Sequence, residues 1–270
     1  MKYIVGLILT FILGIVVAVY ATPNPPKPIQ MVQNTTLGIQ IDTTQGVDSS
    51  ESAKPRTIFK LITKRDNSEP NLKIEYPQID NPQKKVELST INETIKNEVY
   101  KIVHEMAPGY GYTKSKGVLK GSWFETSYTP IRTDDSIVSI KFNIYAYGEG
   151  AAHPNQYTSV FNYSVKQNKR LELENIFKPE SDYLYRLSEL SFPLVLKALT
   201  QKGYEDDEGT KSFVRYGTSP DKFNFQNILI GDNQIIVVFD PYQVGPYSAG
   251  KTEVVIPVDE LFSILATKLD

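Results

Sequence analysis

The feature that most constrains the fold of this chain is a series of short segments rich in β-branched and aromatic residues, several with a two-residue period. This pattern is typical of strands. It predicts strands at 58–62, 72–76, 123–129, 137–145, 157–165, 228–230, 235–239 and 254–256. Helical spacing of apolar residues predicts helices at about 90–108, 179–199 and 259–268, the second kinked or divided by Pro193. Because strands and helices do not alternate over a long stretch, we expect an α+β fold of antiparallel sheets packed with about three helices.

An apolar run at 3–21 follows Lys2 and bears on where the protein works. A helix of this length would span about 28 Å, close to the roughly 30 Å hydrocarbon core of a bilayer. The run also fits a secretory signal peptide, because Val19 and Ala21 are small residues ahead of a possible cleavage site. Both interpretations place the remainder outside the cytoplasm. We favour an uncleaved transmembrane anchor, with secretion after cleavage at Ala21 as the alternative.

The rest of the sequence divides into a polar tether and a folded region. Residues 22–56 are rich in Pro, Ser and Thr and contain too little apolar surface to fold, so a disordered tether is expected there. The folded region is expected to have an N-terminal half at 57–170 and a C-terminal half at 171–270. It is long enough to be stable without a cofactor.

Composition excludes several function classes. The chain has no cysteine, hence no disulfide or thiolate metal site, and its only histidines are His104 and His153. A net charge of -2, from 29 basic and 31 acidic side chains, argues against a nucleic-acid partner. The acidic groups at 134–135 and 205–208 are expected to be solvated, and no phosphate-binding loop or serine-nucleophile motif is present. We therefore expect neither a metal nor a cofactor.

Two loops have an unusual composition for a sheet protein, 145–155 and 240–250. Rigid loops on a sheet commonly carry binding residues. Their aromatic, proline and polar residues form the predicted ligand site: Tyr147, Glu149, His153, Asn155, Tyr242, Pro246 and Tyr247. Two alternatives stay open: Tyr242 and Tyr247 only cover a sheet edge, and His153 only stabilises its turn.

Four motifs resemble one family when taken in order: IEYPQI at 74–79, GEGAAHPN at 148–155, LELENIF at 171–177 and PYQVGPYSAG at 241–250. The family is the extracytoplasmic module shared by RsiV-type anti-sigma factors and the amino-terminal part of PdaC-type peptidoglycan deacetylases. The resemblance covers about residues 57–265. It implies an α+β module outside the membrane. In RsiV-type members this module receives lysozyme, and in PdaC-type members it is attached to a separate deacetylase domain.

From these observations the sequence predicts a membrane-tethered binding module that is not an enzyme. Its expected ligand is a lysozyme-like muramidase or peptidoglycan. Only Met1 and Lys2 precede the apolar run and nothing follows Asp270, so neither a sigma-binding domain nor the metal-binding deacetylase domain is expected. The alternative is a cell-wall glycan hydrolase or deacetylase-like enzyme that uses Glu149 and His153 as an acid/base pair. A structural envelope protein without a soluble ligand is a third possibility.

Overall fold

The computed structural model describes residues 56–57, 59–81, 85–114 and 116–266. All of them belong to one compact unit spanning Ser49–Asp270. The predicted membrane segment at 1–21 and the tether at 22–56, apart from its last residue, lie outside the described residues. Among the helices that are described, none is long and apolar enough to cross a bilayer. The membrane segment therefore stays a prediction.

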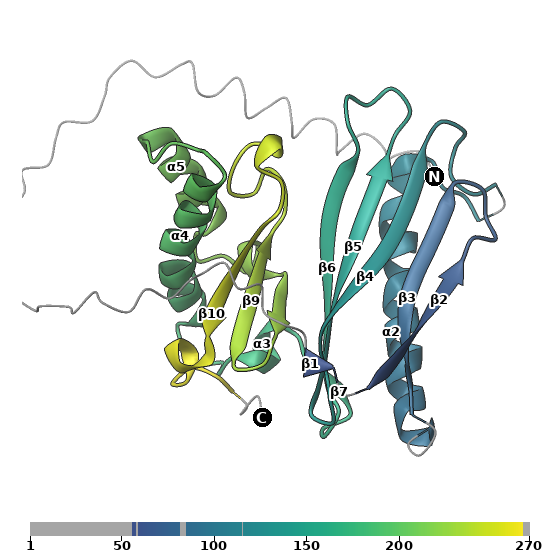
Figure 1. Ribbon diagram of the computed structural model, residues 1–270, viewed down its shortest axis with the longest axis horizontal. Helices are drawn as coiled ribbons and strands as arrows, with labels where there is room; N and C mark the ends of the chain where they lie inside the picture. The colour runs from purple at the N-terminus through teal and green to yellow at the C-terminus, as the bar shows by residue number, and fades with distance from the viewer. Residues whose placement is uncertain (1–55, 58, 82–84, 115, 267–270) are drawn as a thin grey trace, which may run out of the picture. The chain divides into compact units, whose positions relative to one another are not determined.

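Seven strands form one large sheet in the order β2-β3-β4-β5-β6-β7, with β1 paired to β4 (Figure 1). Their bounds are β1 Arg56–Thr57, β2 Lys60–Asp66, β3 Leu72–Asp80, β4 Trp123–Thr133, β5 Ile137–Tyr147, β6 Asn155–Ser164 and β7 Lys169–Arg170. The prediction of an α+β fold with antiparallel sheets is confirmed in part: most strand pairs are antiparallel, but β1 and β3 run parallel to β4, so the large sheet is mixed. The reason is the long helix between β3 and β4, since a helical crossover is what allows two neighbouring strands to run in parallel.

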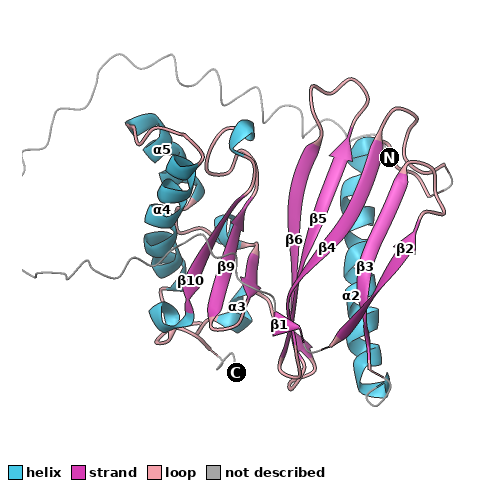
Figure 2. Ribbon diagram, viewed as in Figure 1, coloured by secondary structure: helices cyan, strands magenta, loops and turns pink. Residues whose placement is uncertain are grey.

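Helix α2, Lys85–Met106, supplies that crossover and packs on one face of the large sheet (Figure 2). Residues at helical spacing along its inner side are at most 1% exposed: Ile91, Ile95, Val99 and Val103. They share one core with Phe124 and Phe142 of the sheet. The Asn92 side chain accepts a hydrogen bond from the Ile79 backbone N–H at 2.8 Å and donates to its carbonyl at 3.0 Å. This pair of bonds fixes the helix against the end of β3.

A second, antiparallel sheet has the order β10-β9-β8. Its strands are β8 Ile228–Ile230, β9 Gln234–Phe239 and β10 Thr252–Pro257. Helix α4, Tyr183–Gln201, packs against β10, and helix α5, Glu208–Gly217, packs against α4 (Figure 1). Leu187, Val195 and Leu199 of α4 are buried in one core with the inner residues of β9.

The described region has four α-helices instead of about three: α2, α4, α5 and the short α3, Leu173–Ile176. Helix α5 was missed because its acidic start was interpreted as a solvated turn, whereas the Asp207 carboxylate caps the helix by accepting from the Thr210 N–H at 2.7 Å. Helix α4 continues through Pro193 without division.

The helix predicted at 259–268 is also wrong over the described residues. A 3-10 turn at Val258–Leu261 is followed by irregular turns, and Leu265 forms a β-bridge with Phe177. That bridge uses backbone groups that a helix would need for its own hydrogen bonds.

The two sheets pack face to face through a small apolar cluster of Leu229, Ile236 and Val238, with Ile131 and Val160 against it. Beside this cluster the buried Arg132 pairs with Asp134 at 2.7 Å and donates from Nη1 to the Gly231 carbonyl in the β8–β9 turn at 3.3 Å. The layers of the unit are therefore α2, large sheet, small sheet, and α4 with α5 (Figures 1 and 2). This arrangement brings the β5–β6 and β9–β10 loops to the same end of the two sheets.

Candidate functional site

Three aromatic side chains from these two loops lie together, and we call them the aromatic corner: His153, Tyr242 and Tyr247. The His153 ring stacks on Tyr247 with ring centroids 3.7 Å apart and planes 20° from parallel. The Tyr242 ring lies 5.5 Å from Tyr247 and 6.4 Å from His153. Residues about 90 positions apart in the sequence thus form one cluster.

The Pro154 carbonyl holds the aromatic corner together. It accepts hydrogen bonds from the Tyr247 hydroxyl at 2.6 Å and from His153 Nδ1 at 3.0 Å. Because a carbonyl can only accept, Nδ1 carries the proton. Nε2 lies 3.4 Å from the Tyr242 hydroxyl, a long hydrogen bond in which the neutral imidazole is the acceptor. With both nitrogens engaged, the imidazole is positioned as a structural and contact group.

Tyr242 is displayed by a strained turn. The Gln243 N–H donates to the Asp240 carbonyl at 3.1 Å, Pro241 occupies the second position, and Tyr242 has φ 71°. These features match a type II turn, whose third position normally requires glycine or asparagine. A bulky residue in the left-handed region costs about 1–2 kcal/mol, and such strain is concentrated at functional sites.

The remaining predicted site residues lie away from the aromatic corner or support it. Tyr147 stacks on Trp123 with centroids 6.3 Å apart, and the Asn155 amide donates to the Tyr110 hydroxyl. Pro246 caps the 3-10 turn Tyr247–Ala249 that presents Tyr247.

The structure does not pair Glu149 with His153. The Glu149 N–H donates to Ser122 Oγ, and its carboxylate lies so close to Gly121 that a Cβ added there would be 2.6 Å from Glu149 Cδ. No hydrogen bond or ion pair links the two side chains within the described residues. The geometry therefore gives no support to this acid/base pair.

Two partly buried charged groups of opposite sign, Asp240 and Lys251, flank the β9–β10 loop that carries Tyr242 and Tyr247. One Asp240 oxygen accepts from the Thr158 N–H at 3.0 Å, while the other has no hydrogen-bond partner in the described part of the chain. Burial raises the pKa of Asp240, an effect partly offset by the Thr158 hydrogen bond and the nearby Lys251 charge. Burial lowers the pKa of Lys251, whose Nζ donates to the Tyr157 carbonyl at 2.8 Å. Perturbed groups of this kind are frequent at functional sites.

A cavity of about 600 Å³ adjoins the aromatic corner, and we call it the α5 cleft. Its lining includes Tyr157, Tyr216, Phe223, Asn224, Asp240 and Tyr242. Tyr242 therefore belongs both to the aromatic corner and to the cleft wall. Sequence reasoning missed the part of the cleft contributed by 216–226. The signal that could have indicated it is the set of aromatic residues in this short segment, Tyr216, Phe223 and Phe225, of which the last is buried.

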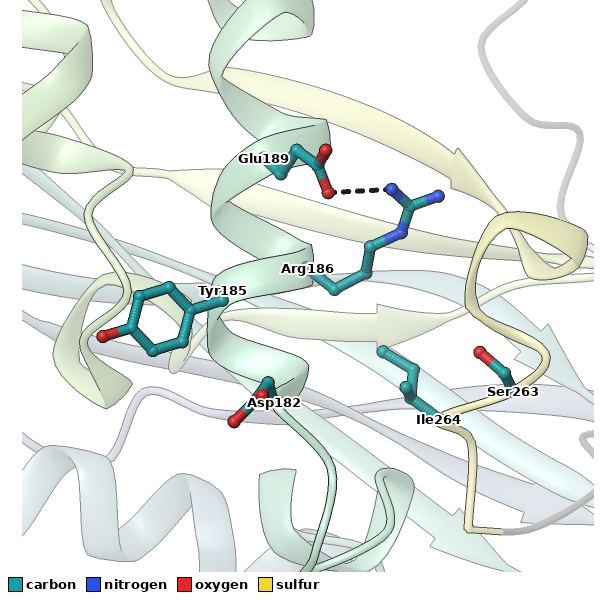
Figure 3. Close-up of a pocket in the computed structure, with 6 residues that line it drawn as sticks. All are labelled: Asp182, Tyr185, Arg186, Glu189, Ser263 and Ile264. Carbon is teal, nitrogen blue, oxygen red and sulfur yellow. Dashed lines mark hydrogen bonds and ion pairs between the residues drawn. The ribbon is translucent and has the colours of Figure 1, made fainter.

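A second cavity, of about 420 Å³, lies near the start of α4 (Figure 3). Its Arg186 donates to Glu189 at 2.9 Å and to Glu260 at 2.6 Å, so the guanidinium is already paired. In Figure 3 Tyr185 points away from Ile264 and Ser263, and no second aromatic ring lines the cavity. This cavity offers less to a ligand than the α5 cleft.

No group of three or more His, Cys, Asp or Glu side chains among the described residues is placed to hold a metal ion.

Two family models match the chain. Residues 63–156 match the family described as deacetylase PdaC, and residues 174–259 match a family described as a protein of unknown function, DUF3298. Two crystal structures of DUF3298 family proteins show the same fold. The protein from Pseudomonas aeruginosa PAO1 has a TM-score of 0.53 at 14% identity over 80% of this chain and 97% of that one. The protein from Bacteroides fragilis has a TM-score of 0.51 at 15% identity over 79% and 96%. The chain thus carries a PdaC/DUF3298-type module. The link to RsiV-type anti-sigma factors stays a prediction.

Curated relatives match parts of longer proteins. The chain is 26% identical over 195 residues to peptidoglycan-N-acetylmuramic acid deacetylase PdaC of Bacillus subtilis, which is 72% of this chain but 39% of that enzyme. It is 24% identical over 117 residues to immunogenic protein MPT64 of Mycobacterium tuberculosis, 43% of this chain and 47% of that protein. The chain thus spans less than half the length of either relative. The prediction that the chain is not an enzyme is contradicted by the deacetylase relative, and we withdraw it.

Proposed function

We propose that this module recognises the glycan of the bacterial cell wall on the outer side of the cytoplasmic membrane, with the aromatic corner as its main contact. The observation that carries the proposal is the convergence of His153, Tyr242 and Tyr247 from two separate loops into one cluster. The relation to a peptidoglycan deacetylase supports the wall as the setting. Peptidoglycan is favoured over a muramidase as the ligand because a cavity adjoins the cluster, and concave sites suit a chain-like ligand.

The exposed ring of Tyr242 is central to the proposed contact. It is 58% exposed, although its ring touches both other members of the corner. The ring presents an apolar face to the ligand. Because the turn that carries Tyr242 is already fixed, the protein loses little further conformational entropy on binding.

Co-sedimentation with purified sacculi tests the proposal. Retention of the wild-type protein is expected, together with a loss of about tenfold or more in affinity, or about 1.4 kcal/mol, for Tyr242→Ala combined with Tyr247→Ala. Tyr185→Ala is a matched control, because Tyr185 is 68% exposed and lies at the other cavity. Unchanged retention of the double variant would show that the aromatic corner does not bind the glycan. Binding to immobilised lysozyme without binding to sacculi would make a muramidase the ligand instead.

Deacetylation of the same glycan is a second candidate, favoured by the name and activity of the Bacillus subtilis relative. The measurement is release of acetate from N-acetylated peptidoglycan fragments by the purified full chain, with and without added divalent metal. Release that tracks protein concentration would support this candidate, and its absence under both conditions would reject it.

A further inference from the structure

The α5 cleft is lined by exposed aromatic rings and by polar side chains. Three aromatic side chains at its edge are strongly exposed: Tyr216 by 81%, Phe223 by 71% and Tyr242 by 58%. Exposed aromatic rings gathered around one cavity are informative, because clustered exposed apolar surface marks interaction sites. The cavity volume, about 600 Å³, lies within the roughly 300–1,000 Å³ typical of ligand sites.

Polar groups between the rings are available to a ligand. The Gln226 side chain has no hydrogen-bond partner within the described residues, and Asp221 uses Oδ1 to accept from the Phe223 N–H. Asp240, with its unpartnered oxygen, also lines the cleft. Aromatic faces beside amide and carboxylate groups match a pyranose ring, which has an apolar C–H face and hydroxyl groups around its edge.

The backbone around the cleft is fixed before any ligand arrives. The buried Asn224 amide donates to the carbonyls of Tyr216 and Ser219, each at 3.1 Å. The Gln243 amide donates to the Asn224 carbonyl at 3.0 Å and to the Gly217 carbonyl at 3.3 Å. These bonds tie the end of α5 to the turn that carries Tyr242. A preorganised site of this kind loses less entropy on binding.

The charge of the lining limits the choice of sugar. Asp221 and Asp240 contribute carboxylates, and no Lys or Arg side chain belongs to the lining. Lys251 lies near Asp240 but is not part of the lining, so an acidic sugar would meet carboxylates with no cationic side chain on the cleft wall. A neutral sugar or one with a free amino group avoids that repulsion.

We propose that the α5 cleft binds a short linear oligosaccharide of neutral or amino-bearing hexosamines, with its sugar rings packed on Tyr216, Phe223 and Tyr242. The inference rests on the proposed recognition of wall glycan and extends it to residues 216–226. The glycan chain runs from the aromatic corner into the cleft, because Tyr242 belongs to both.

Calorimetric titration with three tetrasaccharides tests this inference: chitotetraose, its fully de-N-acetylated counterpart and tetragalacturonate. Chitotetraose and its de-N-acetylated counterpart should both bind, whereas tetragalacturonate should not bind detectably. Binding of the positively charged, de-N-acetylated tetrasaccharide should weaken as salt is added, because salt screens its attraction to the carboxylates. Tyr216→Ala combined with Phe223→Ala should weaken binding about tenfold or more, whereas Tyr185→Ala should not change it. Backbone amide shifts of the unmodified protein should move at 216–226 on addition of chitotetraose, a measurement that does not depend on the stability of any variant.

Each opposite result has a definite meaning. Unchanged affinity of the variant with both Tyr216→Ala and Phe223→Ala, or amide shifts confined to residues outside 216–226, would overturn the assignment of the cleft. The proposed function would still stand if retention on sacculi depends on Tyr242 and Tyr247. Equally tight binding of tetragalacturonate would overturn the charge argument. Failure to bind both the tetrasaccharides and sacculi would reject the two proposals together.

Discussion

At the scale of single residues, Tyr242 has a strained backbone conformation and an exposed side-chain ring. Its positive φ, 71°, is imposed by the turn that follows Pro241, and its ring completes the aromatic corner. The sequence indicated a rigid turn that displays aromatics here, because proline and glycine mark turns locally. It did not indicate the left-handed backbone, since a tyrosine adopts that conformation only when the surrounding structure enforces it.

Two substitutions of Tyr242 distinguish the effect of its backbone strain on stability from the contribution of its ring to ligand binding. Tyr242→Ala and Tyr242→Gly both remove the ring, so both should lose sacculus binding to the same extent. Only alanine keeps the left-handed strain, so Tyr242→Gly should be more stable than Tyr242→Ala by about 1 kcal/mol. Urea denaturation of both variants measures the difference. A glycine variant less stable than the alanine variant would show that the turn does not hold this residue under strain.

At the scale of elements, the end of helix α5 contributes Tyr216 to the wall of the cleft. The sequence prediction missed this helix because the acidic residues at its start, 205–208, were expected to form a solvated turn instead of a helix N-terminus. Its last residue, Gly217, permits the close approach of the β9–β10 loop. A Cβ at Gly217 would lie 1.9 Å from the Gln243 carbonyl oxygen.

The two glycines of α5 provide a matched pair for stability. Gly217→Ala should destabilise the protein by about 1–3 kcal/mol, because the added methyl group overlaps the loop backbone. Gly209→Ala should be neutral or stabilising by up to about 1 kcal/mol, because a Cβ there would be 3.4 Å from the nearest atom, in Asp207. Thermal midpoints of both variants check this. Similar midpoints would show that the loop yields to a side chain at Gly217.

At the scale of the whole folded unit, the packing of one sheet on the other brings the two loops together. Arg132 and Asp134, with side chains 3% and 4% exposed, sit at this junction. Burial raises the pKa of Asp134, but hydrogen bonds from the Ile137 N–H, Arg132 and the Ser136 N–H together hold it below its ordinary value. The pair therefore joins the β4–β5 turn to the small sheet as a charged unit.

Arg132→Met should destabilise the protein by about 3–5 kcal/mol, because it leaves the Asp134 carboxylate buried without its cation. Arg186→Met is the control, since Arg186 forms its ion pairs on the surface and its loss should cost about 0–1 kcal/mol. Chemical denaturation at neutral pH gives both values. If the two variants lose equal stability, the buried pair does not hold the sheets together.

The sequence by itself determined the strands and the class of fold, because alternation of side chains along a strand is a local property. All eight predicted strands are present, with ends moved by a few residues. It also indicated the two loops and, through their motifs, the PdaC-type module. Only the tertiary structure decided that β3 and β4 are parallel, that Tyr242 meets His153, and that Tyr216 and Phe223 face the same cleft. These features depend on contacts such as the one between Tyr242 and His153, which are 89 positions apart, and no local pattern encodes them.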